Sequence, residues 1–285
     1  SWHVFFLQVP TAMADDIAAE FFELASCGVQ LEEDEEDVCL TVYFPDDIDK
    51  TLLERQIQQI LSQAGLTDAS LKPLVSEQVK DQDWNAQWRR FFKPIWISED
   101  LGVRPSWMPL DIKEGQIEII IDPKRAFGTG GHESTRLALL ALKQLLRPEE
   151  QCLDLGTGSG ILAIAALKLG AISVDGIDTD IDAVENAQEN LEINGVAEKA
   201  RVLHGSIEQV QQNRYGLVMA NITCRVLRSL LKDIFAVLKV DGYIIFSGLL
   251  VKFQDAFCGA VNRAGLSVVQ TQVEGEWLCV VARRA

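Results

Sequence analysis

Three glycines at every second position, Gly156, Gly158 and Gly160, constrain the fold of this chain more than any other feature. They follow a short apolar stretch, residues 152–155, and precede a long apolar run, residues 161–169. The first segment has the length and composition of a buried strand, and the second favours a helix. Because glycine has no Cβ atom, the turn can be tight and its backbone can approach a ligand closely. The sequence therefore predicts a strand–turn–helix unit with a ligand at the turn.

A second predicted strand, residues 174–178, ends in Asp178 about twenty residues after the turn, where a parallel α/β sheet holds the ribose hydroxyls of a nucleoside. The dinucleotide fingerprint also requires a glycine at the sixth position, which is Ile161 here. Gly-x-Gly-x-Gly with an acid after the second strand instead resembles the cofactor site of S-adenosyl-L-methionine-dependent methyltransferases, and this resemblance favours a methyltransferase over a dehydrogenase. A tight connection without a ligand is the alternative interpretation.

The net charge of the chain indicates which kind of macromolecule it can bind. The chain has 26 Lys and Arg against 42 Asp and Glu, a net charge of −16, which argues against direct nucleic-acid binding. This charge suits a basic protein substrate, although acidity that only maintains solubility explains it equally well. The six cysteines form no Cys-x-x-Cys pair, which favours a reduced protein without a zinc site. No secretory signal or membrane-spanning run is visible, so we expect a cytoplasmic protein away from membranes. The expected oligomeric state is a monomer.

Residues 1–72 predict a small α+β domain. Its strands are expected at residues 2–9, 29–31 and 38–44, and its helices at residues 14–26 and 48–64. Strand, helix, hairpin and helix make up most of a ferredoxin-like unit. Because no catalytic motif occurs in this range, we expect it to recognise the substrate.

Residues 73–112 are predicted to be a linker rich in proline and tryptophan. They contain Trp84, Trp88, Trp96 and Trp107, four of the six tryptophans in the chain. Aromatic residues in a connecting segment usually pack two domains together, and recognition of a partner is the alternative.

A second glycine-rich stretch, residues 122–135, follows a predicted strand at residues 117–121. Loops of this kind often cover a ligand, and Ser134 and Thr135 can cap the helix that follows. His132 is either a proton acceptor or, as is more common in such loops, a residue that holds the loop's own backbone.

Strands and helices alternate from residue 152 to the end of the chain. The strands are expected at residues 152–155, 174–178, 201–204, 217–222, 243–247, 266–272 and 277–282. This order predicts a doubly wound, seven-stranded, Rossmann-like α/β domain over residues 113–285, with an antiparallel hairpin at its end. Its ligand should bind beyond the carboxyl ends of the strands, where Gly156, Asp178 and Asn221 fall.

Several motifs occur together in residues 83–285. They are Asp83-Trp84, Arg104-Pro-Ser-Trp107, Asp122-Pro123, Ala126-Phe-Gly-Thr-Gly130, Leu153-Asp-Leu-Gly-Thr-Gly-Ser-Gly160, Gly176-Ile-Asp178, Ala220-Asn-Ile222 and Glu276-Trp277. In this combination the chain resembles the ribosomal protein L-eleven methyltransferase family (PrmA). The Phe-Gly-Thr-Gly loop makes the resemblance specific.

The resemblance implies that methyl groups pass from S-adenosylmethionine to lysine side chains or the N-terminal amine of a large-subunit ribosomal protein. It also implies cofactor contacts by Thr135, Gly156, Asp178 and Asn221. The chain departs from the family pattern after Asn221, where Thr223 and Cys224 lead to Arg225 instead of leucine and a small residue. Gly131-His-Glu-Ser-Thr135 is a second departure, since the family often has Gly-Thr-His-Pro-Thr-Thr.

Methyl transfer from a sulfonium mainly requires alignment of the two partners. We therefore expect Asn221 to be the catalytic residue, holding the acceptor or the methionine end by hydrogen bonds. Gly158 should pass close to the cofactor, as should Gly156. Phe127 and Thr129 belong to a loop expected to close over the methionine part together with Thr135.

Two other functions stay open at this point. One is a methyltransferase that acts on another protein or on a nucleic-acid amine. An enzyme for nucleic-acid amines would have the sequence Asn-Pro-Pro-aromatic at this point, whereas here Ile222 and Thr223 follow Asn221. A non-catalytic cofactor-binding module is the other, since intact glycines and Asp178 do not prove turnover.

Overall fold

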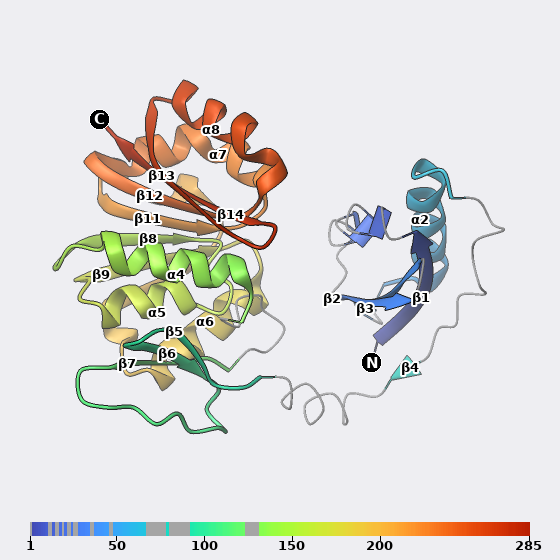
Figure 1. The fold of residues 1–285 in the computed structure, drawn as a ribbon, viewed down its shortest axis with the longest axis horizontal. Coiled ribbons are helices and arrows are strands. Elements are labelled where there is room, and N and C mark those ends of the chain that lie inside the picture. Colours follow the sequence, from blue (N-terminus) through green and yellow to red (C-terminus); the bar gives the residue numbers. More distant parts are fainter. Residues whose placement is uncertain are drawn as a thin grey trace. The chain divides into compact units, whose positions relative to one another are not determined.

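The computed structural model describes residues 2–10, 13–14, 17–18, 20–21, 24, 28–34, 37–45, 48–66, 78–79, 92–122 and 131–285. The chain divides into two compact units, Ser1–Arg90 and Phe91–Ala285 (Figure 1). The roles expected for residues 1–72, 73–112 and 113–285 stay predictions.

The first unit contains a four-stranded sheet in the order β2-β3-β1-β4, in which every paired strand is antiparallel. Its elements are β1 (Trp2–Pro10), β2 (Gly28–Asp34), β3 (Asp37–Pro45), α2 (Lys50–Gln63) and β4 (Gln78–Val79). Between β1 and β2, helical backbone occurs at residues 13–14, 17–18 and 20–21. This is the predicted ferredoxin-like α+β arrangement.

Alternation along β1 and β3 directs one face of this sheet into a core. Phe5, opposite Val42, is fully buried, and so is Val42. From α2, residues at intervals of four pack into the same core, namely Leu53, Ile57 and Leu61. Complete burial of such a side chain contributes about 1.5–3 kcal/mol, so this small unit has a hydrophobic core of its own.

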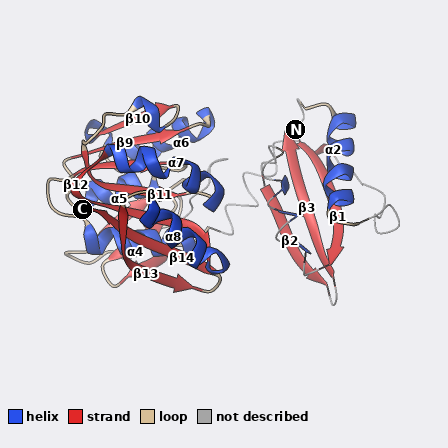
Figure 2. Ribbon diagram, turned by 90° about the horizontal axis from the view of Figure 1, so that it is seen from above, coloured by secondary structure: helices blue, strands red, loops and turns tan. Residues whose placement is uncertain are grey.

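The second unit is organised around the predicted seven-stranded sheet, whose strands are red in Figure 2. The strand order is β10-β9-β8-β11-β12-β14-β13. Its strands are β8 (Gln151–Leu155), β9 (Ser173–Asp178), β10 (Ala200–His204), β11 (Tyr215–Asn221), β12 (Leu238–Leu250), β13 (Leu266–Glu274) and β14 (Trp277–Arg284). The pairs from β10 to β12 are parallel, whereas β14 is antiparallel to β12 and β13. The predicted doubly wound sheet with a closing hairpin is confirmed.

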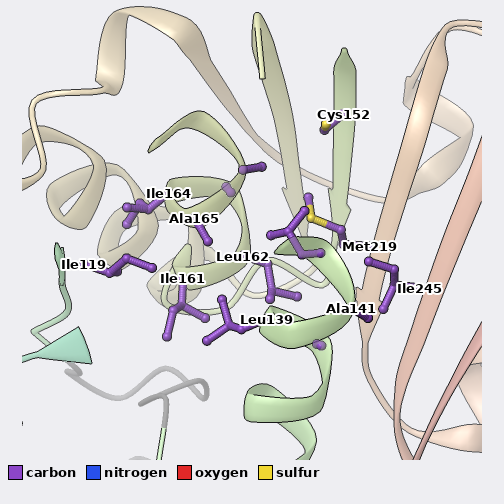
Figure 3. Packing of buried hydrophobic residues seen from close by; sticks show 14 of the residues in the cluster. Ile119, Leu139, Ala141, Cys152, Ile161, Leu162, Ile164, Ala165, Met219 and Ile245 are labelled. Carbon is purple, nitrogen blue, oxygen red and sulfur yellow. The ribbon is translucent and has the colours of Figure 1, made fainter. Parts of the chain in front are cut away.

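Helices cover both faces of this sheet. They are α4 (Glu133–Leu145), α5 (Ile161–Lys168), α6 (Ile181–Ile193), α7 (Cys224–Val237) and α8 (Gln254–Arg263), with short 3₁₀ turns at Ala197–Lys199, Ile207–Gln209 and Val251–Phe253. One face packs against α4 and α5, where Leu139 and Ile164 contact a cluster that includes Met219 (Figure 3). The opposite face packs against α7 and α8, through residues such as Leu227 and Phe257. β11 is buried along most of its length and is almost entirely apolar, as expected for a parallel strand covered on both faces.

A separate three-stranded sheet, which the sequence analysis did not predict, belongs to the same unit. It consists of β5 (Ile95–Ser98), β6 (Leu101–Arg104) and β7 (Ile117–Ile120), with β6 antiparallel to β5 and parallel to β7. Two of these strands lie in the range expected to be a linker. Leu101 and Ile119 are fully buried in the core that contains α4 and α5. The sheet is therefore part of the larger unit.

Within the described ranges, no helix combines the length and the apolar character needed to cross a membrane.

Candidate active site

The turn between β8 and α5 is built on three glycines with left-handed backbone conformation. Gly156, Gly158 and Gly160 have φ angles of 71°, 53° and 81°, which residues with a Cβ atom rarely adopt. The amide of Gly156 donates to the carbonyl of Ile177 at 2.8 Å and so joins the turn to β9. A Cβ atom on Gly156 would overlap Cγ2 of Ile222. The turn requires glycine for its conformation and for its packing.

Asp178, at the end of β9, binds the same turn with its side chain. Its Oδ2 accepts from the backbone amide of Gly158 at 2.9 Å, and its Oδ1 accepts from the amide of Asp180 at 3.0 Å. Each carboxylate oxygen has a second lone pair, so Asp178 can also accept from ligand hydroxyl groups. Because the Gly158 N–H is already bonded, this glycine offers a ligand close approach and not a donor.

A second carboxyl group, that of Asp154, is buried beneath the turn. Its Oδ2 accepts from Oγ1 of Thr157 at 2.8 Å and from the amide of Ala163 at 3.1 Å. Its Oδ1 is buried and has no hydrogen-bond partner among the described residues. Burial raises the pKa of Asp154 to about 7. The sequence analysis did not assign this residue to the site, although a carboxyl group inside an apolar strand signals a polar role.

Asn221, at the end of β11, contacts the first turn of α4. Its Nδ2 donates to Oγ1 of Thr135 at 3.2 Å, and the Ser247 hydroxyl donates to the carbonyl of Ser134 at 2.7 Å. Thr135 and Ser134 are only 0% and 1% exposed. In the part of the chain that the structure describes, the buried Oδ1 of Asn221 has no hydrogen-bond partner. Two strands therefore fix the start of α4 and leave one acceptor of Asn221 for a ligand.

His132 is the N-cap residue of α4. Its Nδ1 accepts from the amide of Ser134 at 3.3 Å, and its ring lies edge-on to Trp277 with the ring centroids 4.4 Å apart. Burial lowers the pKa of His132, so the ring is neutral at neutral pH. This geometry matches the interpretation that His132 holds its own loop.

The strand register brings the two halves of the site together. β8 and β11 pair with Leu155 opposite Ala220, so the next residues, Gly156 and Asn221, are neighbours at the carboxyl edge. Thr135 contacts Asn221, and Asp178 contacts the glycine turn, so these predicted residues share one edge of the sheet. Phe127 and Thr129 lie outside the described residues.

The chemistry of this edge fits S-adenosylmethionine. Asp178 has acceptors for ribose hydroxyls, and the glycine backbone allows close approach. The unpaired oxygens of Asp154 and Asn221 can accept from an ammonium group such as that of methionine. Among the described side chains, no group of three or more His, Cys, Asp or Glu could hold a metal ion.

Comparison with known proteins decides the family. The family model described as "Ribosomal protein L11 methyltransferase (PrmA)" matches residues 10–285. The chain belongs to this family. This match confirms the family and the methyltransferase function that the motifs predicted. It also agrees with the predicted cofactor, S-adenosylmethionine.

Individual members of the ribosomal protein L11 methyltransferase family are similar over most of the chain. The protein of that name from Streptococcus mutans is 34% identical over 256 residues, covering 88% of this chain and 80% of its own length. The one from Streptococcus pneumoniae serotype 4 is 34% identical over 253 residues, with the same coverage. A crystal structure of ribosomal protein L11 methylase from Lactobacillus delbrueckii subsp. bulgaricus superimposes with a TM-score of 0.64 at 31% identity, covering 68% of this chain and 99% of that one.

Proposed function

We propose that this chain methylates lysine side chains or the N-terminal amine of ribosomal protein L11, with S-adenosylmethionine as the methyl donor. Family membership supports the substrate, because the relatives carry its name. The observation that carries the assignment to amines is the Asn221–Thr135 pair beside the glycine turn.

The glycine turn and its carboxylates would bind the cofactor. Asp178 would accept from the ribose hydroxyls while it keeps its bond to the Gly158 amide. Gly156 would lie against the cofactor because it has no side chain of its own to separate its backbone from the ligand. When bound, S-adenosylmethionine supplies a methyl group that its sulfonium already activates.

Asn221 would orient the acceptor amine. Its Nδ2 is bonded to Thr135, so the carboxamide presents Oδ1 as the acceptor. Oδ1 can accept one N–H of a neutral amine and thereby direct the nitrogen lone pair, an alignment that can supply several kcal/mol. An amide cannot take the proton, so the amine must already be neutral, and a lysine amine starts from a pKa near 10.4. Desolvation in the site would lower that pKa.

The other predicted site residues keep their expected roles as part of this proposal. Gly158 would pass close to the cofactor. Phe127 and Thr129 would close over its methionine part together with Thr135.

The first unit would recognise the substrate. Residues 1–72 contain fifteen Asp and Glu against three basic residues, Lys50, Arg55 and Lys72. A surface of this charge attracts a basic ribosomal protein over distances of about one Debye length, roughly 8 Å at physiological salt. Catalysis by a monomer without direct nucleic-acid contact is part of the same proposal.

Incubation of the enzyme with total ribosomal protein and isotope-labelled S-adenosylmethionine tests this function. We expect the label in protein L11, on amine nitrogens. Label confined to another protein or to RNA would overturn the proposed substrate.

A further inference from the structure

Three asparagines one turn apart lie on one side of α6, Asn186 and Asn190 within the helix and Asn194 at its C-cap. Asn186 and Asn190 are 1% and 0% exposed. Asparagine is a poor helix former, so helix propensity does not explain the two inside the helix. Their hydrogen bonds do.

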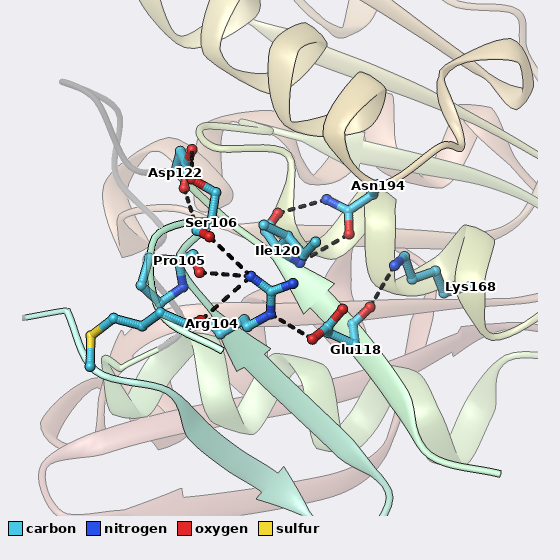
Figure 4. A network of polar contacts seen from close by, with 9 residues as sticks. Arg104, Pro105, Ser106, Glu118, Ile120, Asp122, Lys168 and Asn194 are labelled. Carbon is cyan, nitrogen blue, oxygen red and sulfur yellow. Dashed lines mark hydrogen bonds and ion pairs between the residues drawn. The ribbon is translucent and has the colours of Figure 1, made fainter. Parts of the chain in front are cut away.

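The three carboxamides bond to the backbone at the end of β7. Asn194 accepts from the Ile120 amide at 2.9 Å and donates to the Ile120 carbonyl at 2.6 Å (Figure 4). Asn190 accepts from the Asp122 amide at 3.0 Å, and Asn186 donates to the Asp122 carbonyl at 3.0 Å. Because β7 is the edge strand of its sheet, these side chains take the place of a neighbouring strand.

Asp122 is held from its other side as well. Its carboxylate accepts from the backbone amide and the hydroxyl of Ser106, both at 2.7 Å (Figure 4). Both the backbone and the side chain of Asp122 are thus fixed, and the Asn190 side chain bonds to a firmly held point.

Of the three asparagines, Asn190 also bonds to the glycine turn. Its Nδ2 donates to the carbonyl of Ser159 at 2.8 Å, and Ser159 is fully buried. The turn packs directly on α6 here, since a Cβ atom on Gly160 would lie 3.2 Å from Cα of Ala187. One carboxamide therefore joins the Asp122 amide to the Ser159 carbonyl.

Adjacent residues of the turn are held by two different bonds. Gly158 donates to Asp178 just before α6, and Ser159 accepts from Asn190 inside α6. The Gly160 amide of the same peptide unit donates to the Thr157 carbonyl at 2.8 Å, within the turn itself. Loss of the Asn190 bond would remove the hydrogen bond that ties this peptide to α6, and a shift of the turn would reach the Asp178 contact through the Gly158–Ser159 linkage.

We infer that Asn190 is a positioning residue of the cofactor site, which holds the glycine turn in its cofactor-binding conformation without touching the cofactor. This inference rests on the proposed function, because it assigns the turn to S-adenosylmethionine.

Asn190→Ala tests the inference, with Asn194→Ala as the matched control. Each change removes a carboxamide that pairs with β7, but Asn194 makes its third bond to the Asn190 carbonyl and not to the turn. Calorimetry with S-adenosylmethionine should show Kd raised about tenfold in Asn190→Ala, equivalent to about 1.4 kcal/mol. Asn194→Ala should stay within about twofold of the parent by the same measure.

Steady-state kinetics provide the second measurement. In Asn190→Ala the KM for S-adenosylmethionine should rise, while the KM for the protein substrate and kcat change little. A purely structural role would lower the fraction of active enzyme, and so the apparent kcat, without changing KM. If Asn190→Ala does not fold, Asn190→Ser, which leaves room for water beside Asp122, takes its place.

Unchanged cofactor affinity in Asn190→Ala or Asn190→Ser, or an equal loss in Asn194→Ala, would overturn the inference. These outcomes leave the proposed function standing, because the parent protein still binds the cofactor. Failure of the parent protein to bind S-adenosylmethionine would overturn both.

Discussion

The carboxamide of Asn221 donates to Oγ1 of Thr135 at 3.2 Å, which joins the end of β11 to the first turn of α4. This bond settles which end of the carboxamide is available, because the nitrogen is engaged and the buried Oδ1 has no partner in the described ranges. A neutral amine that donates an N–H to this hydrogen-bond acceptor would be aligned beside the glycine turn. The proposed role of Asn221 depends on this orientation.

Removal of the carboxamide should impair turnover more than cofactor binding. We expect Asn221→Ala to reduce kcat by a factor on the order of 10², as lost positioning usually does. Thr135→Val should also lower kcat, because the Oγ1 atom that accepts from Asn221 is lost. Thr135→Ser keeps the hydroxyl and should have the kcat of the parent. Steady-state kinetics of the three variants test this, and a Thr135→Val enzyme with parental kcat would contradict it.

The carboxylate of Asp178 should matter for cofactor affinity. Asp178→Ala should weaken S-adenosylmethionine binding by roughly 1–3 kcal/mol, the usual cost of leaving buried hydrogen-bonding groups unpaired. Asp180→Ala is the matched control, since Asp180 caps α6 by accepting from the Asp182 amide at 2.9 Å. Calorimetry should show near-parental affinity for that control. Tight binding of NADH with no heat from S-adenosylmethionine would refute the cofactor assignment.

Asp154 should make the stability of the fold depend on pH. Burial raises its pKa from 3.8 to about 7, so the folded chain binds this proton more tightly than the unfolded chain. The free energy of unfolding should therefore fall as pH rises from about 4 to about 7. Asp154→Asn cannot lose a proton, so relative to the parent it should gain stability between pH 4 and pH 8, on the order of 4 kcal/mol at about 1.36 kcal/mol per pKa unit. Urea unfolding at both pH values measures this, and a pH-independent difference would rule it out.

His132 should contribute to stability and not to proton transfer. His132→Ala should lower the free energy of unfolding by about 0.5–2 kcal/mol, the usual cost of a lost helix cap. His132→Asn keeps a capping acceptor and should retain stability. In both variants the rate should still rise through about pH 8 to 10, where a lysine amine loses its proton. Loss of that rise in His132→Asn would identify His132 as the proton acceptor.

The seven-stranded sheet could be predicted because local signals coincide with its tertiary structure. β8 and β11 are buried strands of mainly apolar residues, with Asp154 as the charged exception in β8, and the glycines before α5 mark the turn. The sheet of β5, β6 and β7 escaped prediction because two of its four-residue strands lie among prolines. Its pairing of Leu101 with Ile117 is set by tertiary contacts.

The same limit applies within the site. The position of Gly156, Asp178 and Asn221 at one edge of the sheet could be predicted, because each lies at the end of a predicted strand or directly after it, and carboxyl ends of parallel strands share an edge. Their roles stay predictions. The position of Asn190 could not be predicted, because polar residues at intervals of four in a helix normally indicate an exposed face. Asn186 and Asn190 are buried because the chain at the end of β7 packs against this face of α6, as does the glycine turn, and only the tertiary structure shows these contacts.

Mass spectrometry of purified ribosomal protein L11, after incubation with S-adenosylmethionine and this enzyme, tests the central claim most directly. The account predicts added methyl groups on lysine side chains or the N-terminal amine with the parent enzyme, and almost none with Asn221→Ala. An enzyme that binds S-adenosylmethionine but leaves L11 unmodified, or that methylates an atom other than an amine nitrogen, would contradict it.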